Sequence, residues 1–429
     1  MSSTRRVSLR LSIWEGCFYA VMVGASESLA LFLAVKRGAT APELAVLTTL
    51  PVLLGAFSQW VVPFFVRLEN LKRTMLIFIG IQMVGLLGLV FAAVAPNPFP
   101  YFLGSLSLYW VGGLTCGPLW LDWISNWLPR NRMSRFLSRR NSLLAFVTLA
   151  SYLVSTTFIY FSKSYKGFAC VFALALVARL LSWSTMFRQK SPPLPTRDTP
   201  FRPVVPESGH GRVVVLCILF TVLFKFTVNL SSPFFLPYTV KDLHFDLWQY
   251  TLLTAVPFVG RFAFLSQWGE ASKSFRPMVG LQIAMVLIAV NPSLWTYNQN
   301  LGYLMTLELF SGALWGGFDL CVVLIIQSYW HGSARKILGL HLSLMSVASL
   351  YGARIGAAWH EGGLSFEEIF VRSSNLRAIV AFTCVIALVG LKETRIPLKS
   401  YGNFLSTALS LRLSFDNIGR MLPLRRKKA

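Results

Sequence analysis

The chain has 429 residues, of which 55% are hydrophobic and only 13% are charged, and its formal net charge is +23. A soluble domain carries about 25% charged residues, so this composition excludes an ordinary soluble protein. Such a positive charge would otherwise indicate a nucleic-acid-binding protein, but the basic residues gather between apolar stretches, which argues against nucleic acid as a partner.

Twelve apolar stretches follow one another along the chain, and the mean hydropathy is +0.58. About 20 helical residues cross the hydrocarbon core of a bilayer, whereas spanning β-strands would be shorter and would alternate in polarity. The sequence therefore predicts an all-α polytopic membrane protein with twelve transmembrane helices. These helices are expected at 11–35, 42–66, 74–95, 99–124, 141–161, 167–187, 213–238, 247–268, 277–295, 301–326, 338–360 and 376–392.

Lys and Arg are unequally divided between the two sides of such a bundle. If the N-terminus is cytoplasmic, the inside segments carry 29 of the 40 Lys and Arg residues, and the outside loops, with Arg372 and Arg377 among them, carry seven. The positive-inside rule favours this orientation, with both termini in the cytoplasm. All six cysteines fall within predicted spans, without the spacing of a disulfide framework or a metal site, so we expect no metal and no other cofactor.

The second half of the sequence repeats landmarks of the first half about 200 residues later. An internal repeat of this kind indicates architecture more securely than a short motif does. It predicts two six-helix halves, 1–187 and 213–392, that face each other across a central path. The repeated landmarks are Val35-Lys36 with Val240-Lys241, Pro51 with Pro257, Ser58-Gln59-Trp60 with Ser266-Gln267-Trp268, Gly112 with Gly312, Leu114 with Leu314, and Arg135 with Arg335.

The remaining segments are polar and basic. Residues 188–212 are rich in Pro and have no apolar face to bury, which predicts a cytoplasmic linker between the halves. Residues 361–375 are a candidate for a short interfacial segment. The basic tail, 393–429, is either a helix lying on the anionic cytoplasmic leaflet or a disordered segment. Its apolar residues at helical spacing are Tyr401, Leu405, Ala408 and Leu409.

Charged residues within the predicted spans are the natural candidates for function. A charge near the bilayer centre costs about 2.5–3.5 kcal/mol, so it usually faces the bundle interior or a wet cavity. Lys225 and Asn229 share one helix face, as do Glu308, Trp315 and Asp319. The candidates for substrate binding or coupling are Glu27, Lys225, Asn229, Glu308, Trp315, Asp319 and Arg354.

For several of these residues two interpretations stay open. Lys225 either faces a central cavity or belongs to a structural ion pair, and Arg354 either serves the site or locks helices together through Glu27 or Glu308. Buried carboxyls of this kind are also candidate proton carriers. Arg179 and Arg261 lie nearer the predicted cytoplasmic helix ends, where we expect them to act as anchors that snorkel to the interface.

An arginine-rich segment, 126–141, follows Asp122 at the inner end of the fourth predicted helix. Its arginines either only enforce topology or also pair with Asp122 as a latch when the cytoplasmic side is closed. The candidate cytoplasmic gate consists of Arg73, Asp122, Arg135 and Arg335.

Two six-helix halves, a basic linker and basic turns after helices 2, 4, 8 and 10 resemble the major facilitator superfamily over about 10–392. The local sequences at 117–125 with the turn 129–140, and at 266–277, look like segments of its bacterial members. The family's signature between helices 2 and 3 is Gly-x-x-x-Asp-Arg-x-Gly-Arg-Lys. Here the sequence FFVRLENLKR (64–73) keeps basic residues but lacks the glycines, so the signature turn is degraded.

The resemblance implies alternating access, in which two halves rock about a midplane site lined by helices 1, 4, 7 and 10. It implies a secondary transporter for a small organic solute, anionic or zwitterionic, with or without proton coupling. We expect a monomer in the lipid bilayer of the bacterial inner membrane. The sequence has no Gly-rich phosphate-binding loop, so we do not expect direct use of ATP. The alternatives are a transporter-like sensor or assembly protein without transport, and a lipid-modifying membrane enzyme, for which no catalytic constellation is evident.

Overall fold

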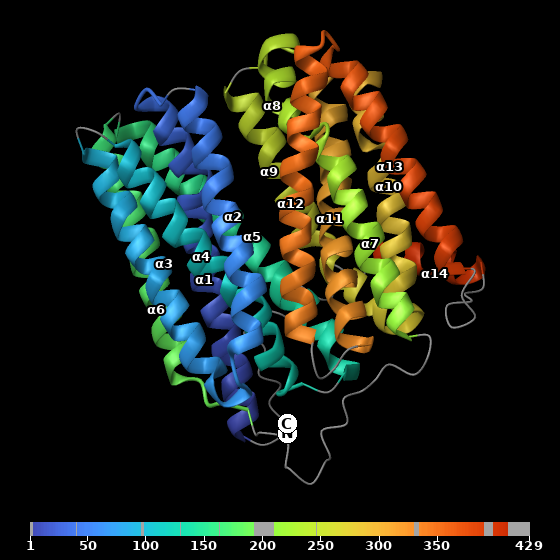
Figure 1. The fold of residues 1–429 in the computed structure, drawn as a ribbon, viewed down its shortest axis with the longest axis horizontal. Coiled ribbons are helices and arrows are strands. Elements are labelled where there is room, and N and C mark those ends of the chain that lie inside the picture. Colours follow the sequence, from blue (N-terminus) through green and yellow to red (C-terminus); the bar gives the residue numbers. More distant parts are fainter. Residues whose placement is uncertain are drawn as a thin grey trace, which may run out of the picture. The chain divides into compact units, whose positions relative to one another are not determined.

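The computed structural model describes residues 3–39, 41–95, 98–128, 130–162, 164–192, 210–245, 247–329, 334–389 and 398–410. Every regular element in these ranges is helical, and twelve helices have 20 residues or more (Figure 1), so the predicted all-α architecture is confirmed. Ten of the twelve are long and apolar enough to cross a membrane by composition alone.

The twelve long helices are α1 (Ser3–Lys36), α2 (Ala41–Phe65), α3 (Leu71–Val94), α4 (Phe99–Ser125), α5 (Arg130–Ser162), α6 (Tyr165–Arg188), α7 (His210–Asn229), α9 (Leu247–Phe275), α10 (Pro277–Tyr297), α11 (Leu301–Tyr329), α12 (Ala334–Glu361) and α13 (Phe366–Val389). The short elements are η1 (Leu68–Asn70), η2 (Ser232–Phe234), α8 (Phe235–Pro237), η3 (Tyr238–Asp242) and α14 (Leu398–Ala408).

The seventh helix is shorter than predicted. It ends at Asn229 instead of residue 238, and three short helical turns replace its last part. Pro233 has no N–H for the helix ladder and disfavours helical backbone at the residue before it, so the Ser231-Ser232-Pro233 sequence breaks the helix. Residues directly after this break line the pocket of the candidate site.

The last long helix begins earlier than predicted, at Phe366 instead of residue 376, so 361–375 is not a separate interfacial segment. Ser365 and Glu368 form a capping box. The backbone N–H of Glu368 donates to Ser365 Oγ (3.2 Å), and the backbone N–H of Ser365 donates to Glu368 Oε2 (2.8 Å). The sequence Ser-x-x-Glu was therefore a start signal that the hydropathy pattern concealed. Likewise, α5 begins at Arg130, within the segment expected to be a turn.

The chain divides into two compact units, each assembled from three segments. Unit 1 consists of Met1–Pro129, Phe146–Arg202 and Ser333–Val347, and unit 2 consists of Arg130–Ala145, Pro203–Gly332 and Ala348–Ala429. The helices α5 and α12 therefore each contribute one end to either unit. Most of the predicted linker, 193–209, lies outside the described residues.

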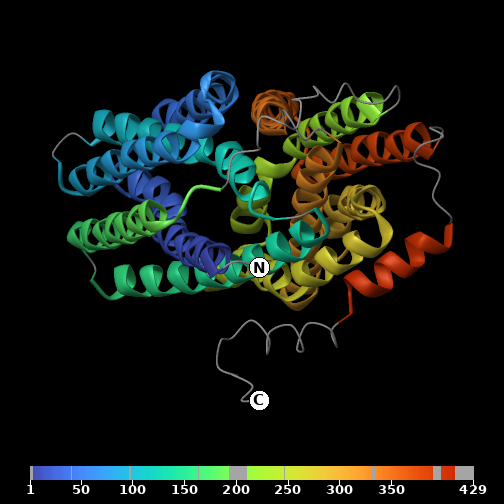
Figure 2. The same ribbon diagram turned by 90° about the horizontal axis from the view of Figure 1, so that it is seen from below.

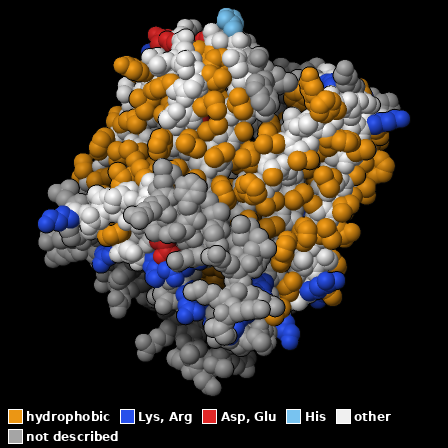
Figure 3. Space-filling model, turned by 180° about the vertical axis from the view of Figure 1, so that it is seen from behind, with side chains coloured by type: hydrophobic (Ala, Val, Ile, Leu, Met, Phe, Trp, Pro, Cys, Tyr) orange, Lys and Arg blue, Asp and Glu red, His pale blue; other side chains and the backbone are white. Residues whose placement is uncertain are grey.

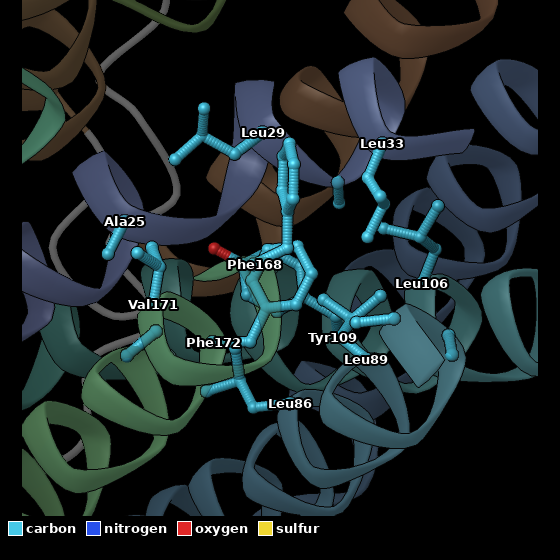
Figure 4. Close-up of a cluster of buried hydrophobic side chains, with 14 of the residues drawn as sticks. Ala25, Leu29, Leu33, Leu86, Leu89, Leu106, Tyr109, Phe168, Val171 and Phe172 are labelled. Atoms are coloured by element: carbon cyan, nitrogen blue, oxygen red, sulfur yellow. The ribbon is translucent and has the colours of Figure 1, made fainter. Parts of the chain in front are cut away.

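The core of unit 1 is formed by α1, α3, α4 and α6. Phe168 and Phe172 of α6 are completely buried beside Leu29 and Leu33 of α1 and Leu106 of α4 (Figure 4). Burial of such side chains stabilises the packed helices through close van der Waals contact, which is the main driving force once helices are inside a membrane.

Small residues allow corresponding helix pairs in the two units to approach closely. A Cβ at Gly55 of α2 would lie 2.7 Å from the carbonyl oxygen of Trp110 on α4. A Cβ at Gly260 of α9 would likewise collide with the carbonyl oxygen of Leu309 on α11. Only glycine fits such contacts, so corresponding helix pairs in the two units pack closely through a glycine, in agreement with the internal repeat of the sequence.

The helix α14 packs against α9 and α10 within unit 2 (Figure 2). Phe404 and Ala408 are completely buried, and the ring of Phe404 lies 5.3 Å from that of Trp268 on α9. Tyr401 Oη also donates to Gln282 Oε1 of α10 at 2.6 Å. Of the two alternatives for the tail, a helix forms over 398–408, and its residues Phe404 and Ala408 pack against protein. Residues 411–429 lie outside the described part of the chain.

Large apolar side chains also lie on the surface. Figure 3 shows them spread over the visible flanks, and Phe161 and Ile386 are 75% and 74% exposed. An exposed apolar surface of this extent indicates contact with lipid. The chain is thus a multi-pass membrane protein.

Candidate functional site

Unit 2 contains a pocket of about 440 Å³. Helices α7, α9, α10, α11 and α13 contribute to it, together with the segment that follows the break in α7. Its lining residues are Lys225, Val228, Ser232, Phe235, Thr239, Tyr250, Leu253, Thr254, Pro257, Ile288, Asn291, Trp295, Glu308, Ser311, Trp315 and Arg377. A concave site with aromatic walls and a few charged groups is typical of small-molecule binding.

Three of the predicted site residues come together in this pocket: Lys225, Glu308 and Trp315. Lys225 Nζ lies 5.0 Å from the centroid of the Trp315 ring, which is cation–π distance. Of the two interpretations of Lys225, the structure favours the cavity, because its ammonium lies over an aromatic ring in the pocket wall.

Among the described residues, the carboxyl of Glu308 accepts hydrogen bonds from uncharged side chains. Trp295 Nε1 donates to Glu308 Oε1 at 3.0 Å, and the side chains of Ser311 and Asn291 add hydrogen bonds. A carboxyl surrounded by donors and aromatic rings can change its protonation state or accept a cationic group without first breaking an ion pair.

Arg377 is a pocket residue that the sequence analysis missed, because it assigned this arginine to an outside loop. The structure places it inside α13, only 3% exposed. Its Nη2 donates to the carbonyl oxygen of Val228 (3.0 Å) and to Ser231 Oγ (2.6 Å), and its Nε donates to Ser373 Oγ (3.2 Å). The capping box at Ser365 was the signal that could have placed Arg377 three turns into a helix.

The remaining predicted pocket residues lie elsewhere. Asp319 is exposed and forms an ion pair with Arg261 of α9, so Arg261 is not the interfacial anchor that we expected. Asn229 Nδ2 donates to the carbonyl oxygen of Lys225 (2.9 Å) and to Ser349 Oγ (3.1 Å), which secures the end of α7. Arg354 is exposed on α12 and does not line the pocket.

Glu27 lies in unit 1, on α1. Tyr109 Oη of α4 donates to Glu27 Oε1 at 2.9 Å, and Ser26 Oγ lies 3.4 Å from the same tyrosine hydroxyl. The alternative pairing of Arg354 with Glu308, both in unit 2, is not among the ion pairs of the described residues. Glu27 is thus a partly buried carboxyl whose hydrogen-bonding partner is a neutral hydroxyl.

Arg179 is also placed differently from the prediction. It is 2% exposed and lies 3.8 Å from Glu15 of α1, instead of reaching an interface. Its Nη1 donates to Ser182 Oγ (2.9 Å), which in turn donates to Glu15 Oε1 (3.2 Å). The guanidinium also lies 5.1 Å from the Tyr19 ring. A buried arginine with these partners is stabilised within the core of unit 1, which removes the need to snorkel.

The predicted gate residues have different surroundings where the structure describes them. Arg135 forms a bidentate ion pair with Glu270 of α9, within unit 2. The backbone oxygen of Asp122 accepts from the side chains of Ser125 (2.7 Å) and Asn126 (2.8 Å) at the end of α4.

Arg73 is exposed at the start of α3, and the side chain of Arg335 lies outside the described residues. The neighbouring Lys72 was overlooked by the sequence analysis. Its Nζ donates to the carbonyl oxygens of Phe187 and Gln189, both at 2.7 Å, and so caps the C-terminal end of α6.

The segment between α7 and α9 closes one side of the pocket. The ring of Phe235 lies 4.4 Å from Phe370 and 4.8 Å from Trp295, centroid to centroid. Tyr238 Oη donates to Glu367 Oε1 at 3.1 Å. Burial, followed by the nearby charge of Glu367, raises the pKa of Tyr238 to about 12, so its hydroxyl remains a donor at neutral pH.

Comparison with solved structures shows that transporters of known structure share the described fold. The human organic anion transporter MFSD10 (TETRAN) superposes with a TM-score of 0.64 and 13% identity, over 89% of this chain and 100% of that chain. A substituted form of the E. coli fucose:proton symporter FucP gives a TM-score of 0.65 and 12% identity, over 87% and 98%. No family model matches the sequence, and no curated protein sequence matches it.

Proposed function

We propose that this protein is a secondary transporter that moves a small organic anion or zwitterion across the membrane by alternating access. The observation that carries the proposal is the pocket of unit 2, where Lys225, Arg377 and Glu308 lie among aromatic walls. The fold supports it, because the two similar structures named above are an organic anion transporter and a fucose:proton symporter.

The chemistry of the pocket favours a solute with an acidic group and an apolar or aromatic body. Two cationic side chains, Lys225 and Arg377, outnumber the one carboxyl, Glu308, so a single negative charge on the solute balances the pocket. The rings of Trp295, Trp315 and Phe235 offer stacking surfaces. The cavity of about 440 Å³ falls within the range of about 300–1,000 Å³ for small-ligand sites.

Coupling to protons is part of the proposal, with Glu27 as the carrier. Its partner is the neutral hydroxyl of Tyr109, so it can gain or lose a proton without releasing a cation. Asp319 is less suited, because it is held by Arg261. We further propose a monomer in a bacterial inner membrane with both termini cytoplasmic, without enzymatic activity, in which Arg135 and Glu270 replace the degraded signature turn as a gating contact.

A ligand screen followed by transport tests the proposal. The purified protein is screened by thermal shift against carboxylates, amino acids and neutral solutes of similar size, and each stabilising compound is then tested for uptake by proteoliposomes. We expect carboxylates or zwitterions to stabilise the wild type, and Lys225→Ala to abolish the response. Exchange of Lys166, an exposed lysine on α6, for Ala is the control. A protein that is stabilised only by neutral solutes, or that binds carboxylates without transporting them, would overturn the proposal.

A further inference from the structure

The broken end of α7 is held by two side chains of α13. Ser373 Oγ donates to the carbonyl oxygen of Thr227 (2.7 Å) and lies 3.1 Å from Ser231 Oγ. Arg377, one helical turn further along, donates through Nη2 to the carbonyl oxygen of Val228 and to Ser231 Oγ. The last carbonyls of a helix have no partner within it, so these bonds satisfy groups that the break leaves free.

Arg377 also lines the pocket, so the same guanidinium contacts both the end of α7 and the pocket. A guanidinium has five N–H donors, and the bonds to the end of α7 and to Ser373 use Nη2 and Nε. Nη1 takes part in none of these bonds. Directly beyond the break, Ser232 and Phe235 form part of the pocket wall.

We propose that Arg377 binds the acidic group of the solute through its pocket-facing N–H groups while it holds the end of α7, and that it thereby transmits pocket occupancy to the wall segment 231–242. The inference rests on the proposed function and deepens it, because it names a carboxylate or similar planar oxyanion as the group recognised. It also assigns a binding role to α13, which lies outside the helices that the resemblance implied for the path.

Lys225 and Arg377 differ in the shape of their cationic groups, and we expect them to bind the solute differently for that reason. The planar fork of an arginine matches a carboxylate with two parallel hydrogen bonds, whereas a lysine acts as a point charge on a flexible stem. Lys225 is therefore expected to tolerate arginine better than Arg377 tolerates lysine. An Arg377→Lys variant keeps the charge but loses both the fork and the bonds to α7.

The experiment uses the purified full-length protein and carboxylates paired with their neutral amides, beginning with benzoate and benzamide. A cysteine introduced as Ser232→Cys reports on the wall segment through its rate of maleimide labelling, in a background where the exposed Cys170 is replaced by Ser. Ser373→Ala removes the hydrogen bond from Ser373 to Thr227 and the oxygen that accepts from Arg377 Nε, whereas the bonds from Arg377 Nη2 to the end of α7 stay. Ser374→Ala is the matched control, because Ser374 Oγ donates to the carbonyl oxygen of Ala289 on α10 instead.

We expect benzoate, and not benzamide, to slow labelling in the otherwise wild-type reporter and in the Ser374→Ala variant. Arg377→Lys should weaken benzoate binding by about 10-fold or more, as loss of a charge-assisted bidentate contact does. Ser373→Ala should retain binding, yet its labelling rate should respond less to benzoate than that of the Ser374→Ala control.

Two results would overturn the inference while leaving the proposed function intact. One is benzoate affinity that depends on Lys225 and is unchanged in Arg377→Lys. The other is labelling in Ser373→Ala that still responds to benzoate as in the control. If no carboxylate of the panel stabilises the wild type, the proposed function itself fails.

Discussion

Lys225 Nζ on α7 lies 5.0 Å from the ring centroid of Trp315 on α11, in the wall of the unit 2 pocket. A lysine within an apolar membrane-spanning segment is costly unless its charge is compensated. The face of the indole ring supplies part of that compensation, and it leaves the ammonium hydrogens available to an acidic solute.

Removing this ammonium should weaken anion binding. A hydrogen bond to a charged group contributes about 1.5–3 kcal/mol, so Lys225→Ala should reduce carboxylate affinity by roughly 10- to 100-fold. Trp315→Phe keeps an aromatic face and should cost less. Calorimetric titration with the stabilising carboxylate measures both, with Lys166→Ala as the control. Equal affinities for wild type and Lys225→Ala would remove Lys225 from the site.

Replacing the carboxyl of Glu27 in unit 1 should uncouple transport from protons and leave solute binding unchanged. Glu27→Gln keeps the size of the side chain and an acceptor for Tyr109, but it cannot release a proton. We expect solute accumulation driven by a pH gradient to fall to simple equilibration in proteoliposomes, with carboxylate affinity within about 3-fold of wild type, since the pocket lies in unit 2. Gradient-driven accumulation by Glu27→Gln at the wild-type level would refute coupling through this residue.

The ion pair between Arg135 and Glu270 is partly exposed, with 45% and 25% of the two side chains accessible, so its contribution to stability is small. A double-mutant cycle with Arg135→Ala and Glu270→Ala should give a coupling free energy of about 0.2–1 kcal/mol. The charge-reversed single variant Glu270→Arg should be less stable than the swapped pair, Arg135→Glu with Glu270→Arg. Thermal unfolding measures each variant, and indifference to charge reversal would show that the contact is not formed.

The buried ion pair of unit 1, between Arg179 and Glu15, should contribute much more to stability than the exposed pair does. Arg179→Gln leaves Glu15 without its cation inside the bundle, and breaking a buried pair typically costs about 3–5 kcal/mol. The double variant Glu15→Gln with Arg179→Gln removes both charges and should recover much of the loss. The midpoint of unfolding in detergent reports the comparison. If Arg179→Gln alone matched the wild type, the snorkelling prediction would be reinstated.

Docking of α14 should depend on Phe404. Truncation of a buried Phe to Ala costs about 3–5 kcal/mol, which is enough to release a helix of 11 residues from α9 and α10. Phe404→Ala should therefore become sensitive to limited proteolysis between α13 and α14, whereas Asn403→Ala, at an exposed neighbouring position, should not. Identical cleavage of the two variants would show that the helix is held by other contacts.

The apolar stretches determined the helical class of the protein, and ten of the twelve long helices were predicted to within nine residues at both ends. This succeeds because a bilayer imposes its thickness on every span, whatever the neighbouring helices are. The exceptions, α5 and α13, begin with polar or charged turns that hydropathy alone discounts. The capping box at Ser365 carried the missing information.

The partners of the charged residues within the helices were decided only by the tertiary structure. Sequence spacing placed Lys225, Glu308 and Trp315 on faces of two helices, and these residues do meet in one pocket. It could not show that Arg261 pairs with Asp319, because that contact joins residues on separate helices. Nor could it reveal Arg377, whose role depends on where α7 breaks and on how α13 packs beside it. Periodicity orients a side chain around its own helix axis, whereas the packing of helices against one another determines what that side chain meets.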